Sequence, residues 1–396
     1  MIDTDVVIVG AGPVGLCLAK ALSLQGLQIH LLEQQPQSNI SEPNFDGREI
    51  ALTHASKEIM DKLGLWDKLL SDDVSHISEA RIFNGASLFS LDINGQDSGN
   101  DVLGFLISNH LIRKAAYQAV ENVESIHIRY ETTIKKITHS VEHVELTLNN
   151  GEIIKSKLLV GADSRFSETR RMMGISADMH DFGKSMMVCQ MTHTLPHLNA
   201  AWEWFDYGQT LALLPMNGMK SSVVLTLSKN EIDNLMQLPD VLFNENITKR
   251  FKNRLGEMQL VSSKHAYPLV TAYSNRMVSK RFALVGDAAV GMHPVTAHGF
   301  NFGLKSVVTL ANEIHLGSKK RVDIGSDQLL SRYELQHRKG TRPLFLATHA
   351  VAKLYSTDKM PLRLIRTGAI RLGQRVKPFK RRIAEFLAEK NSQRLT

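Results

Sequence analysis

The chain begins with a short β-branched run, and its hydrophobic period then changes several times. Residues 5–9 (DVVIV) are typical of a buried parallel strand, residues 16–26 follow a helical pattern, and residues 28–34 (QIHLLEQ) form a second strand. A strand, a helix and a strand in this order predict a βαβ unit at the N-terminus.

Beyond this unit the pattern is mostly of period two, interrupted by helices. Residues 45–66 lead through an extended loop into a helix, and residues 109–120 (NHLIRKAAYQAV) are helical. Period-two alternation predicts antiparallel strands in four stretches: residues 80–92, 126–163, 184–228 and 258–270. An Asn-Asn-Gly turn at 149–151 makes the second stretch typical of a β-meander.

The last part of the chain returns to the first pattern. Residues 282–289 (FALVGDAA) contain another buried parallel-type strand, and everything beyond about residue 299 is helical. We therefore predict an α/β fold in which a Rossmann-like domain is interrupted by a strand-rich α+β domain and followed by a helical tail. The predicted segments are 1–75, 100–180 and 270–340 for the nucleotide-binding domain, 76–99 and 181–269 for the substrate domain, and 341–396 for the helical, basic C-terminal region.

Composition narrows the protein class. A length of 396 residues suggests two domains. The two cysteines, Cys17 and Cys189, match neither a zinc site nor a redox pair, which favours a reducing cytoplasm. Because the chain shows no signal-peptide pattern and no apolar run of about 18 residues, we expect a protein that is soluble or lies on a surface.

The net charge of +7 is concentrated in the tail. From Met360 onward there are ten Lys or Arg and two Glu, a balance of +8, so the first 359 residues sum to −1. A nearly neutral body argues against a general nucleic-acid-binding surface. The basic tail needs its own explanation.

The first candidate site is the stretch GAGPVG. Gly10, Gly12 and Gly15 fit G-x-G-x-x-G, in which the first glycine permits a tight turn, the second lets a pyrophosphate approach, and the third allows helix and strand to pack closely. Glu33 ends the second strand, where an acid can bind a ribose hydroxyl. This unit predicts an adenosine nucleotide with an unphosphorylated ribose, FAD or NAD.

Two later turns repeat the same chemistry. Asp163 follows an apolar strand and precedes a helix that contains Arg170. Asp287 follows another strand, and a run of small residues then enters a helix at Gly299. An acid at such a turn accepts hydrogen bonds from hydroxyl groups, and the NH groups of a new helix can face an electron-rich oxygen. Each turn alone is also explained by a capped helix, but three of them favour a long ligand.

Together these motifs resemble the FAD-dependent aromatic hydroxylases of the para-hydroxybenzoate hydroxylase type and, within them, the ubiquinone-biosynthesis hydroxylases. The resemblance covers nearly the whole chain. It rests on GAGPVG with Glu33, on DGREIAL with Arg48, on GADSRFSETR for the family's G-A-D-G-x-x-S-x-x-R, and on GDAAVGMHPVTAHGFNFG for its G-D-A-A-H-x-x-x-P-x-x-G-x-G-x-N-x-G. The last stretch is most similar to a broad-specificity branch that includes a 5-demethoxyubiquinol hydroxylase.

The resemblance implies roles for individual residues. Gly10, Gly12 and Gly15 would hold the pyrophosphate of FAD, and Glu33 its adenosine ribose. The other implied cofactor contacts are Arg48 and Arg113 at its middle, Asp163 behind the pyrophosphate loop, Asp287 at the ribityl chain, and the NH groups around Gly299, Phe300 and Asn301 at the flavin pyrimidine. Pro294 would stand near the flavin face, and His298 or His293 could carry a proton from the substrate, so Pro294 and His298 are the catalytic candidates.

The sequence departs from the family pattern at three positions. Val290 replaces the usual His, Ser164 replaces a Gly, and His298 stands where most relatives have Gln or Lys. These changes affect the expected handling of substrate or electron donor, and the FAD prediction is unaffected.

The implied reaction is hydroxylation of a polyprenylated phenol or quinol by O₂ through a flavin C4a-hydroperoxide, with NAD(P)H or another reductant and without a metal. A geranylgeranyl-type reductase on the same FAD frame and a non-enzymatic prenyl-binding protein on a related fold remain alternatives. A plain NAD dehydrogenase does not explain GDAAVGMHP, and the WEW at 202–204 lacks the following Ile-Pro of flavin-dependent halogenases. The ring position, prenyl length, electron donor, proton carrier and oligomeric state stay open.

The tail carries an apolar stripe at helical spacing, with Lys and Arg on the other faces. The stripe consists of Ile365, Ala369, Leu372, Val376, Phe379, Ile383 and Phe386. It fits either packing against the body or a surface helix on anionic lipid. Since a prenylated substrate resides in the bilayer, we expect a cytoplasmic enzyme that is peripheral on the inner membrane, or one that docks other ubiquinone-biosynthesis proteins through this region.

Overall fold

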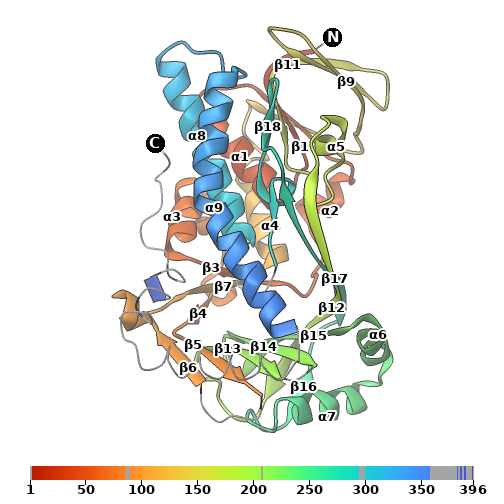
Figure 1. The fold of residues 1–396 in the computed structure, drawn as a ribbon, viewed down its shortest axis with the longest axis vertical. Helices are drawn as coiled ribbons and strands as arrows, with labels where there is room; N and C mark the ends of the chain where they lie inside the picture. The colour runs from red at the N-terminus through yellow and green to blue at the C-terminus, as the bar shows by residue number, and fades with distance from the viewer. Residues whose placement is uncertain are drawn as a thin grey trace.

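The computed structural model describes residues 2–85, 90–206, 208–293 and 299–356, and residues 381, 384, 385, 388 and 395 of the tail. Two β-sheets form the two ends of the molecule, and long helices run beside the first sheet toward the second (Figure 1). The predicted α/β fold with an inserted strand-rich part is confirmed.

The first sheet has a parallel centre. Its order is β18 (Val278–Ser279), β19 (Phe282–Leu284), β11 (Ile153–Gly161), β1 (Ile2–Val9), β2 (Ile29–Leu32) and β8 (Ile126–Arg129). Strands β19, β11, β1, β2 and β8 pair in parallel, and β18 pairs with β19 in antiparallel fashion. Strands β9 (Ile134–His139) and β10 (Val144–Leu148) extend β11 as the predicted meander.

One part of the meander prediction is wrong. Residues 126–129 form β8 and pair with β2 in parallel, because the chain returns from the helix α4 (Asn109–Gln118) to the edge of the parallel sheet. A period of two shows which side chains share a face, but it does not show the direction of the neighbouring strand.

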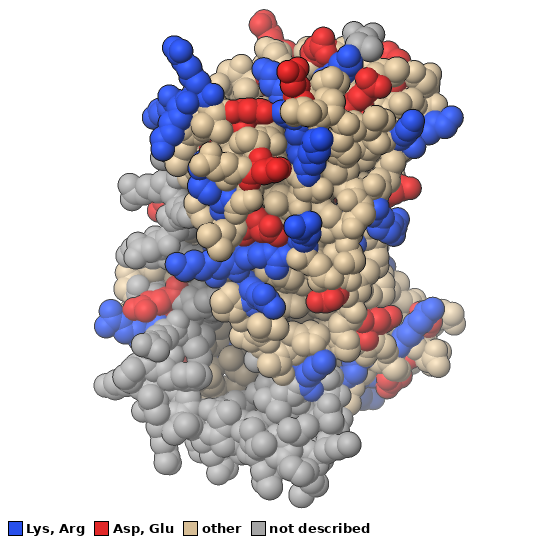
Figure 2. Space-filling view, turned by 45° about the horizontal axis from the view of Figure 1, so that its top comes forward, with Lys and Arg blue, Asp and Glu red and all other residues tan. Residues whose placement is uncertain are grey.

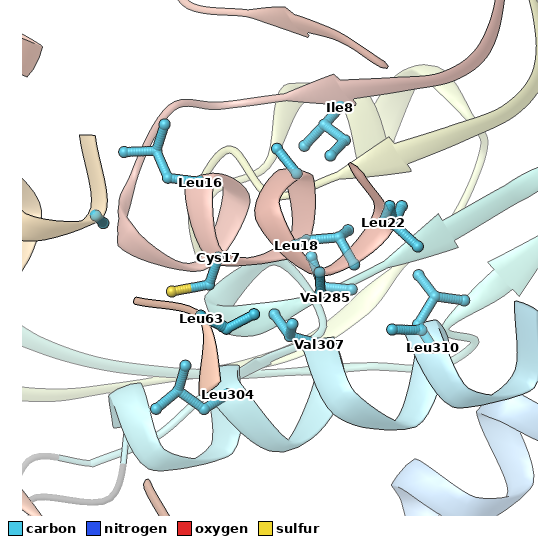
Figure 3. Packing of buried hydrophobic residues seen from close by; sticks show 14 of the residues in the cluster. Ile8, Leu16, Cys17, Leu18, Leu22, Leu63, Val285, Leu304, Val307 and Leu310 are labelled. Carbon is cyan, nitrogen blue, oxygen red and sulfur yellow. The ribbon is translucent and has the colours of Figure 1, made fainter. Parts of the chain in front are cut away.

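Helices α1 (Pro13–Ser23), α8 (Gly299–Lys319) and α9 (Asp327–Ser356) build the main helical layer. In Figure 3, Leu18 and Leu22 of α1 lie close to Val307 and Leu310 of α8, with Val285 at the same interface. All five side chains are fully or almost fully buried. Burying a Leu or Val side chain contributes roughly 1.5–3 kcal/mol to the free energy of unfolding. This interface therefore holds α1 against α8.

Glycine makes the close approach of α1 and α8 possible. A Cβ at Gly303 would lie 2.4 Å from Cγ2 of Val14, and a Cβ at Gly286, whose φ is +59°, would lie 3.0 Å from Cγ1 of the same residue. Val14 therefore occupies a notch that these two glycines leave open. This contact explains why positions 286 and 303, in the second glycine-rich run of the sequence, carry glycine.

The second sheet is mainly antiparallel. Its order is β20 (Val290–Gly291), β17 (His265–Ser274), β12 (Ala177–His193), β15 (Lys220–Ser228), β14 (Gln209–Met216), β13 (Ala200–Asp206), β5 (Glu79–Asn84) and β6 (Ser90–Asn94), with β16 (Met258–Leu260) beside β12. Helices α6 (Lys229–Gln237) and α7 (Asp240–Arg250) cover one face. Strands β12 and β17 cross the predicted boundaries near residues 180 and 270, so those segment limits stay a prediction.

A small third sheet lies between the other parts. It contains β3 (Glu49–Leu52), β7 (Gly104–Ser108) and β4 (Ser75–Ile77), and the short helices α2 (Gln37–Ser41), α3 (His54–Lys62) and α5 (Glu168–Met172) complete the fold. Ala384 of the tail is fully buried in a cluster with Ile77, Leu91, Ile93, Leu103 and Leu106. The predicted apolar stripe at 365–386 itself falls outside the described residues.

Surface charge is mixed on the face in Figure 2, where Lys and Arg side chains alternate with Asp and Glu over the coloured area. Within the described residues, none of the helices combines the length and the apolar character that crossing a bilayer requires.

We expect Gly303→Ala to lower the free energy of unfolding by about 1–3 kcal/mol, because the added methyl group would overlap the stiff Val14 side chain. The matched control is Gly340→Ala in α9, where an added Cβ meets no atom within 4 Å. That variant should be more stable by about 1 kcal/mol, since alanine is the better helix former. Urea unfolding measures both, and equal effects would contradict the proposed notch.

Candidate active site

One cavity of about 760 Å³ joins the two parts of the molecule. Its wall runs from the glycine turn after β1, past the strand ends of the first sheet, to one face of β12, β14 and β15 in the second sheet. The cavity is therefore lined by segments that are far apart in the sequence.

The glycine turn has the shape that the sequence predicts. Gly10 has φ +106°, and a Cβ there would lie 2.7 Å from the carbonyl oxygen of Ala162. A Cβ at Gly15 would lie 2.0 Å from the carbonyl oxygen of Gly10. Gly12 differs, because a Cβ there meets no protein atom within 4 Å and the residue lines the cavity. Gly10 and Gly15 thus serve packing, while Gly12 leaves space in front of the first turn of α1.

Glu33 holds this turn. Its Oε2 accepts a hydrogen bond of 2.7 Å from the NH of Ala11, and its Oε1 accepts one of 2.9 Å from the NH of Gln35. The residue lines the cavity although it is 93% buried. A carboxylate has about four acceptor positions, so it can still accept from a ligand hydroxyl.

Arg48 and Arg113 both line the cavity beside Glu33. Arg48 forms an ion pair of 2.6 Å with Asp46, and its guanidinium lies 5.4 Å from the ring centre of Tyr267. Arg113 donates to the carbonyl oxygen of Asn39. Arg48 and Arg113 are thus two of several cations on the wall of the cavity.

Asp163 supports its own turn. It accepts 2.6 Å from the hydroxyl of Ser167 and 3.1 Å from the NH of Thr169, at the start of α5. The Cα of Asp163 would lie 2.9 Å from a Cβ at Gly10, so this turn packs directly behind the glycine turn.

Asp287 also lines the cavity, and it has a partner that the sequence analysis did not identify. Nη2 of Arg165 forms an ion pair of 2.9 Å with its Oδ2, and Nη1 of the same guanidinium donates to the carbonyl oxygen of Val270. Arg165 stands inside the quoted GADSRFSETR motif. In the sequence, Arg165 is visible only as a cation two residues after Asp163. This spacing does not reveal that Arg165 pairs with Asp287, which is 122 residues away.

The start of α8 lies beside Asp287. Gly299 and Phe300 line the cavity, and a Cβ at Gly299 would lie 3.9 Å from Oδ1 of Asp287. Asn301 is buried and does not line it. Its side chain accepts from the NH of Thr53 and donates to the carbonyl oxygen of Ala51, so it ties α8 to the third sheet.

The two catalytic candidates, Pro294 and His298, lie outside the described residues. His293 lines the cavity, where burial first and nearby His349 and Arg165 second lower its pKa to about 4. It is therefore neutral at pH 7. Within the described residues, no group of three or more His, Cys, Asp or Glu side chains could hold a metal ion.

Two acids in the cavity wall were also missed, the buried Glu49 and the partly buried Glu203. Glu49 accepts hydrogen bonds of 2.8 Å from Ser108 and Gln190, and burial raises its pKa to about 7 against the effect of those bonds. Burial raises the pKa of Glu203, on β13, to about 8. The sequence signal for Glu203 was a single charge in an otherwise apolar strand, within the WEW that we compared with halogenases.

The residues present fit a long dinucleotide. The open first turn of α1 and Gly12 can receive a pyrophosphate, with Glu33 on one side for a ribose. Asp287 and the start of α8 offer an acceptor and NH groups on another part of the wall of the same cavity. The sheet face beyond them leaves room for a second, mostly apolar ligand.

Comparison with known proteins agrees with this geometry. The FAD binding domain family matches residues 3–341. The chain is 42% identical over 390 residues to the ubiquinone hydroxylase UbiM of Neisseria meningitidis, covering 98% of this chain and 85% of that protein. It is 32% identical to the ubiquinone hydroxylase UbiL of Rhodospirillum rubrum, covering 95% and 87%.

A solved structure shows the same fold at lower identity. The p-nitrophenol 4-monooxygenase PnpA of Pseudomonas putida DLL-E4 superposes with a TM-score of 0.79 at 17% identity, covering 99% of this chain and all of that one.

The raised pKa of Glu49 predicts how stability depends on pH. Between pH 4.5 and 7 the folded protein keeps a proton that the unfolded chain releases, so this contribution is complete below pH 4.5 and is lost as pH rises through 7. Between pH 5 and 8 the free energy of unfolding should fall by about 2–3 kcal/mol more in the wild type than in Glu49→Gln. Urea unfolding at both pH values measures this, and the same fall in both proteins would refute it.

Proposed function

The chain belongs to the FAD binding domain family and is a FAD-dependent aromatic hydroxylase of ubiquinone biosynthesis, and we propose that it hydroxylates the ring of a polyprenylated phenol or quinol in the described cavity. One observation carries the proposal. A single cavity connects the dinucleotide-binding turn, Asp287 with the start of α8, and a largely apolar sheet face. A cofactor and a prenylated ring can therefore meet in one enclosed space.

FAD would lie along the first part of this wall. Gly12 and the first turn of α1 would receive the pyrophosphate, with Gly10 and Gly15 shaping the turn, and Glu33 would bind the adenosine ribose. Arg48 and Arg113 would contact the middle of the cofactor, and Asp163 would hold the pyrophosphate loop from behind.

The flavin end would lie at Asp287 and α8. Asp287, fixed by Arg165, would accept hydrogen bonds from the ribityl chain, and the NH groups around Gly299 and Phe300 would face the flavin pyrimidine. Asn301 would act indirectly, because its hydrogen bonds to the backbone of Thr53 and Ala51 hold the start of α8 against the third sheet.

Bound FAD supplies the redox chemistry, because it accepts electrons from NAD(P)H or another reductant and activates O₂. The protein's own share is to bind, orient and exclude water. The cavity walls contributed by Met186, Val188, Leu214 and Val224 are apolar, which suits an aromatic ring that carries a prenyl chain. His293 is neutral at pH 7 and can accept a hydrogen bond from a substrate hydroxyl.

The cofactor prediction is tested by flavin retention. Asp287→Ala removes a charge-assisted acceptor worth roughly 1.5–3 kcal/mol, so FAD should bind about 10- to 100-fold more weakly. Gly12→Val should also prevent FAD binding, because its side chain would fill the space in front of the first turn of α1. A Cβ at this position meets no protein atom within 4 Å, so the fold should stay intact. Absorbance at flavin wavelengths and titration of apoprotein with FAD give both values.

The matched control is Asp323→Ala, which breaks the ion pair between Arg281 and Asp323 away from the cavity. It should keep the affinity for FAD. Full flavin content in both cavity variants would show that the assigned cofactor wall is wrong.

The hydroxylase reaction requires that the added oxygen come from O₂. With ¹⁸O₂ in the gas phase, mass spectrometry should find one labelled oxygen in the ring of the product, and labelled water should contribute none. Product formed under strict anaerobiosis would instead favour reduction of a prenyl double bond by the same FAD frame.

We also propose that the basic tail places the enzyme on the cytoplasmic side of the inner membrane, where a prenylated substrate resides. Among the described tail residues, buried Ala384 supports packing at that point, and Arg381 is exposed and pairs with Glu385. A basic surface helix gains roughly 1 kcal/mol per cation near an anionic membrane. The tail can therefore be anchored to the body and still present cations.

Changing Arg375, Lys377, Lys380, Arg381 and Arg382 to Gln should reduce sedimentation with anionic vesicles, and salt should weaken binding of the wild type. The control removes five exposed cations elsewhere: Lys135, Lys136, Lys319, Lys320 and Arg321. A folded, flavin-containing tail variant that sediments as well as this control would exclude the membrane role and leave protein docking or core packing.

A further inference from the structure

Glu203 lies on the side of the second sheet that faces the cavity. Its neighbours in sequence, Trp202 and Trp204, point to the other face, into the core cluster beneath α7. Side chains alternate between the faces of a strand, so Glu203 and Phe205 face the opposite way. Both residues line the cavity.

The surroundings of this carboxyl are apolar. Strand pairing places Glu203 opposite Ala212, which pairs with Val224, which in turn pairs with Val188. These three partners line the cavity in the same row. On its other side Glu203 is opposite Ile82 of β5. Among the described residues, no hydrogen-bond or ion-pair partner of the Glu203 side chain is found.

An acid in this position is costly to the fold. The Glu203 side chain is partly buried among apolar residues, so its carboxylate is poorly hydrated and gains no protein bond in return, and this burial raises the pKa of Glu203 to about 8. Glu49 in the same cavity is different, because Ser108 and Gln190 satisfy it. A leucine would suit the row at position 203 better than an acid. The carboxyl is therefore explained by a ligand that uses it.

We propose that Glu203 recognises the substrate by forming a hydrogen bond with a ring oxygen of the phenol or quinol. The assignment rests on the proposed function, which supplies an aromatic ligand with such an oxygen. A carboxyl group suits this task in either protonation state: ionised, it accepts from a ring hydroxyl, and protonated, it can also donate to a ring oxygen. The apolar row around it holds the ring itself.

This role predicts a specific form of selectivity. A site built to bond a ring hydroxyl rejects the analogue that lacks it, since the buried polar group is then left unpaired. The FAD-loaded wild type should bind 2-geranylphenol roughly 10-fold or more tightly than geranylbenzene, as measured by the change in flavin fluorescence on titration. Glu203→Leu should bind the two compounds equally well, and Glu203→Gln, which keeps hydrogen-bonding atoms, should keep most of the preference.

A stability measurement separates recognition from a structural role. Glu203→Leu should raise the melting temperature, because it replaces an unpaired acid by an apolar side chain, whereas a structural acid would lower it on removal. Glu245→Gln, an exposed acid of α7 in the same sheet region, should change neither selectivity nor melting temperature.

The proposal is overturned if Glu203→Leu keeps the preference of the wild type for 2-geranylphenol, or if the wild type shows no preference or binds neither compound. The proposed hydroxylation is read separately, from ¹⁸O₂ incorporation into 2-geranylphenol. If the preference for 2-geranylphenol depends on Glu203 but no labelled product forms, the recognition role is upheld and the hydroxylase assignment is contradicted for this compound.

Discussion

The contact of Val14 with Gly286 and Gly303 sets the distance between the two halves of the proposed cofactor wall. Val14 stands just inside α1, next to Gly12, while Gly286 and Gly303 flank the segment that carries Asp287. A methyl group on either glycine would push these segments apart. Because both ends of a long ligand must be met at once, this close packing decides whether the cavity fits a dinucleotide.

Most acids of the cavity wall are held in place by the protein itself. Glu33 bonds the glycine turn, Asp163 bonds the start of α5, Asp287 pairs with Arg165, and Glu49 is bonded by Ser108 and Gln190. Such bonds fix the carboxylates before a ligand arrives, so little ordering cost remains for binding. Glu203 departs from this arrangement, which is why it stands apart functionally.

The glycine turn, the strand-end acids and the helix starts could be predicted from the sequence because each is a local pattern of turn and element. The pairs Arg165–Asp287 and Asn301–Ala51 could not, since they join segments whose separation only the fold determines. For β8, alternation did not reveal a parallel partner. The face of Glu203 could have been inferred from Trp202 and Trp204, but only once those tryptophans were known to form a core.

Because side chains alternate between the two faces of β13, the two faces of the second sheet have different roles. On one side the indoles of Trp202 and Trp204 pack against α7 in a core that fixes the position of β13. On the other side the backbone so fixed presents Glu203 to the cavity. Strand β12 runs from this sheet toward the first, pairing with β15 at residues 184–192 and with β17 at residues 177–181 and 185–188. A ring held against this face is therefore positioned relative to the cofactor wall by paired strands whose register shifts once, between Asp181 and Ser185, so the point of attack on the ring depends on where the sheet places its polar contact.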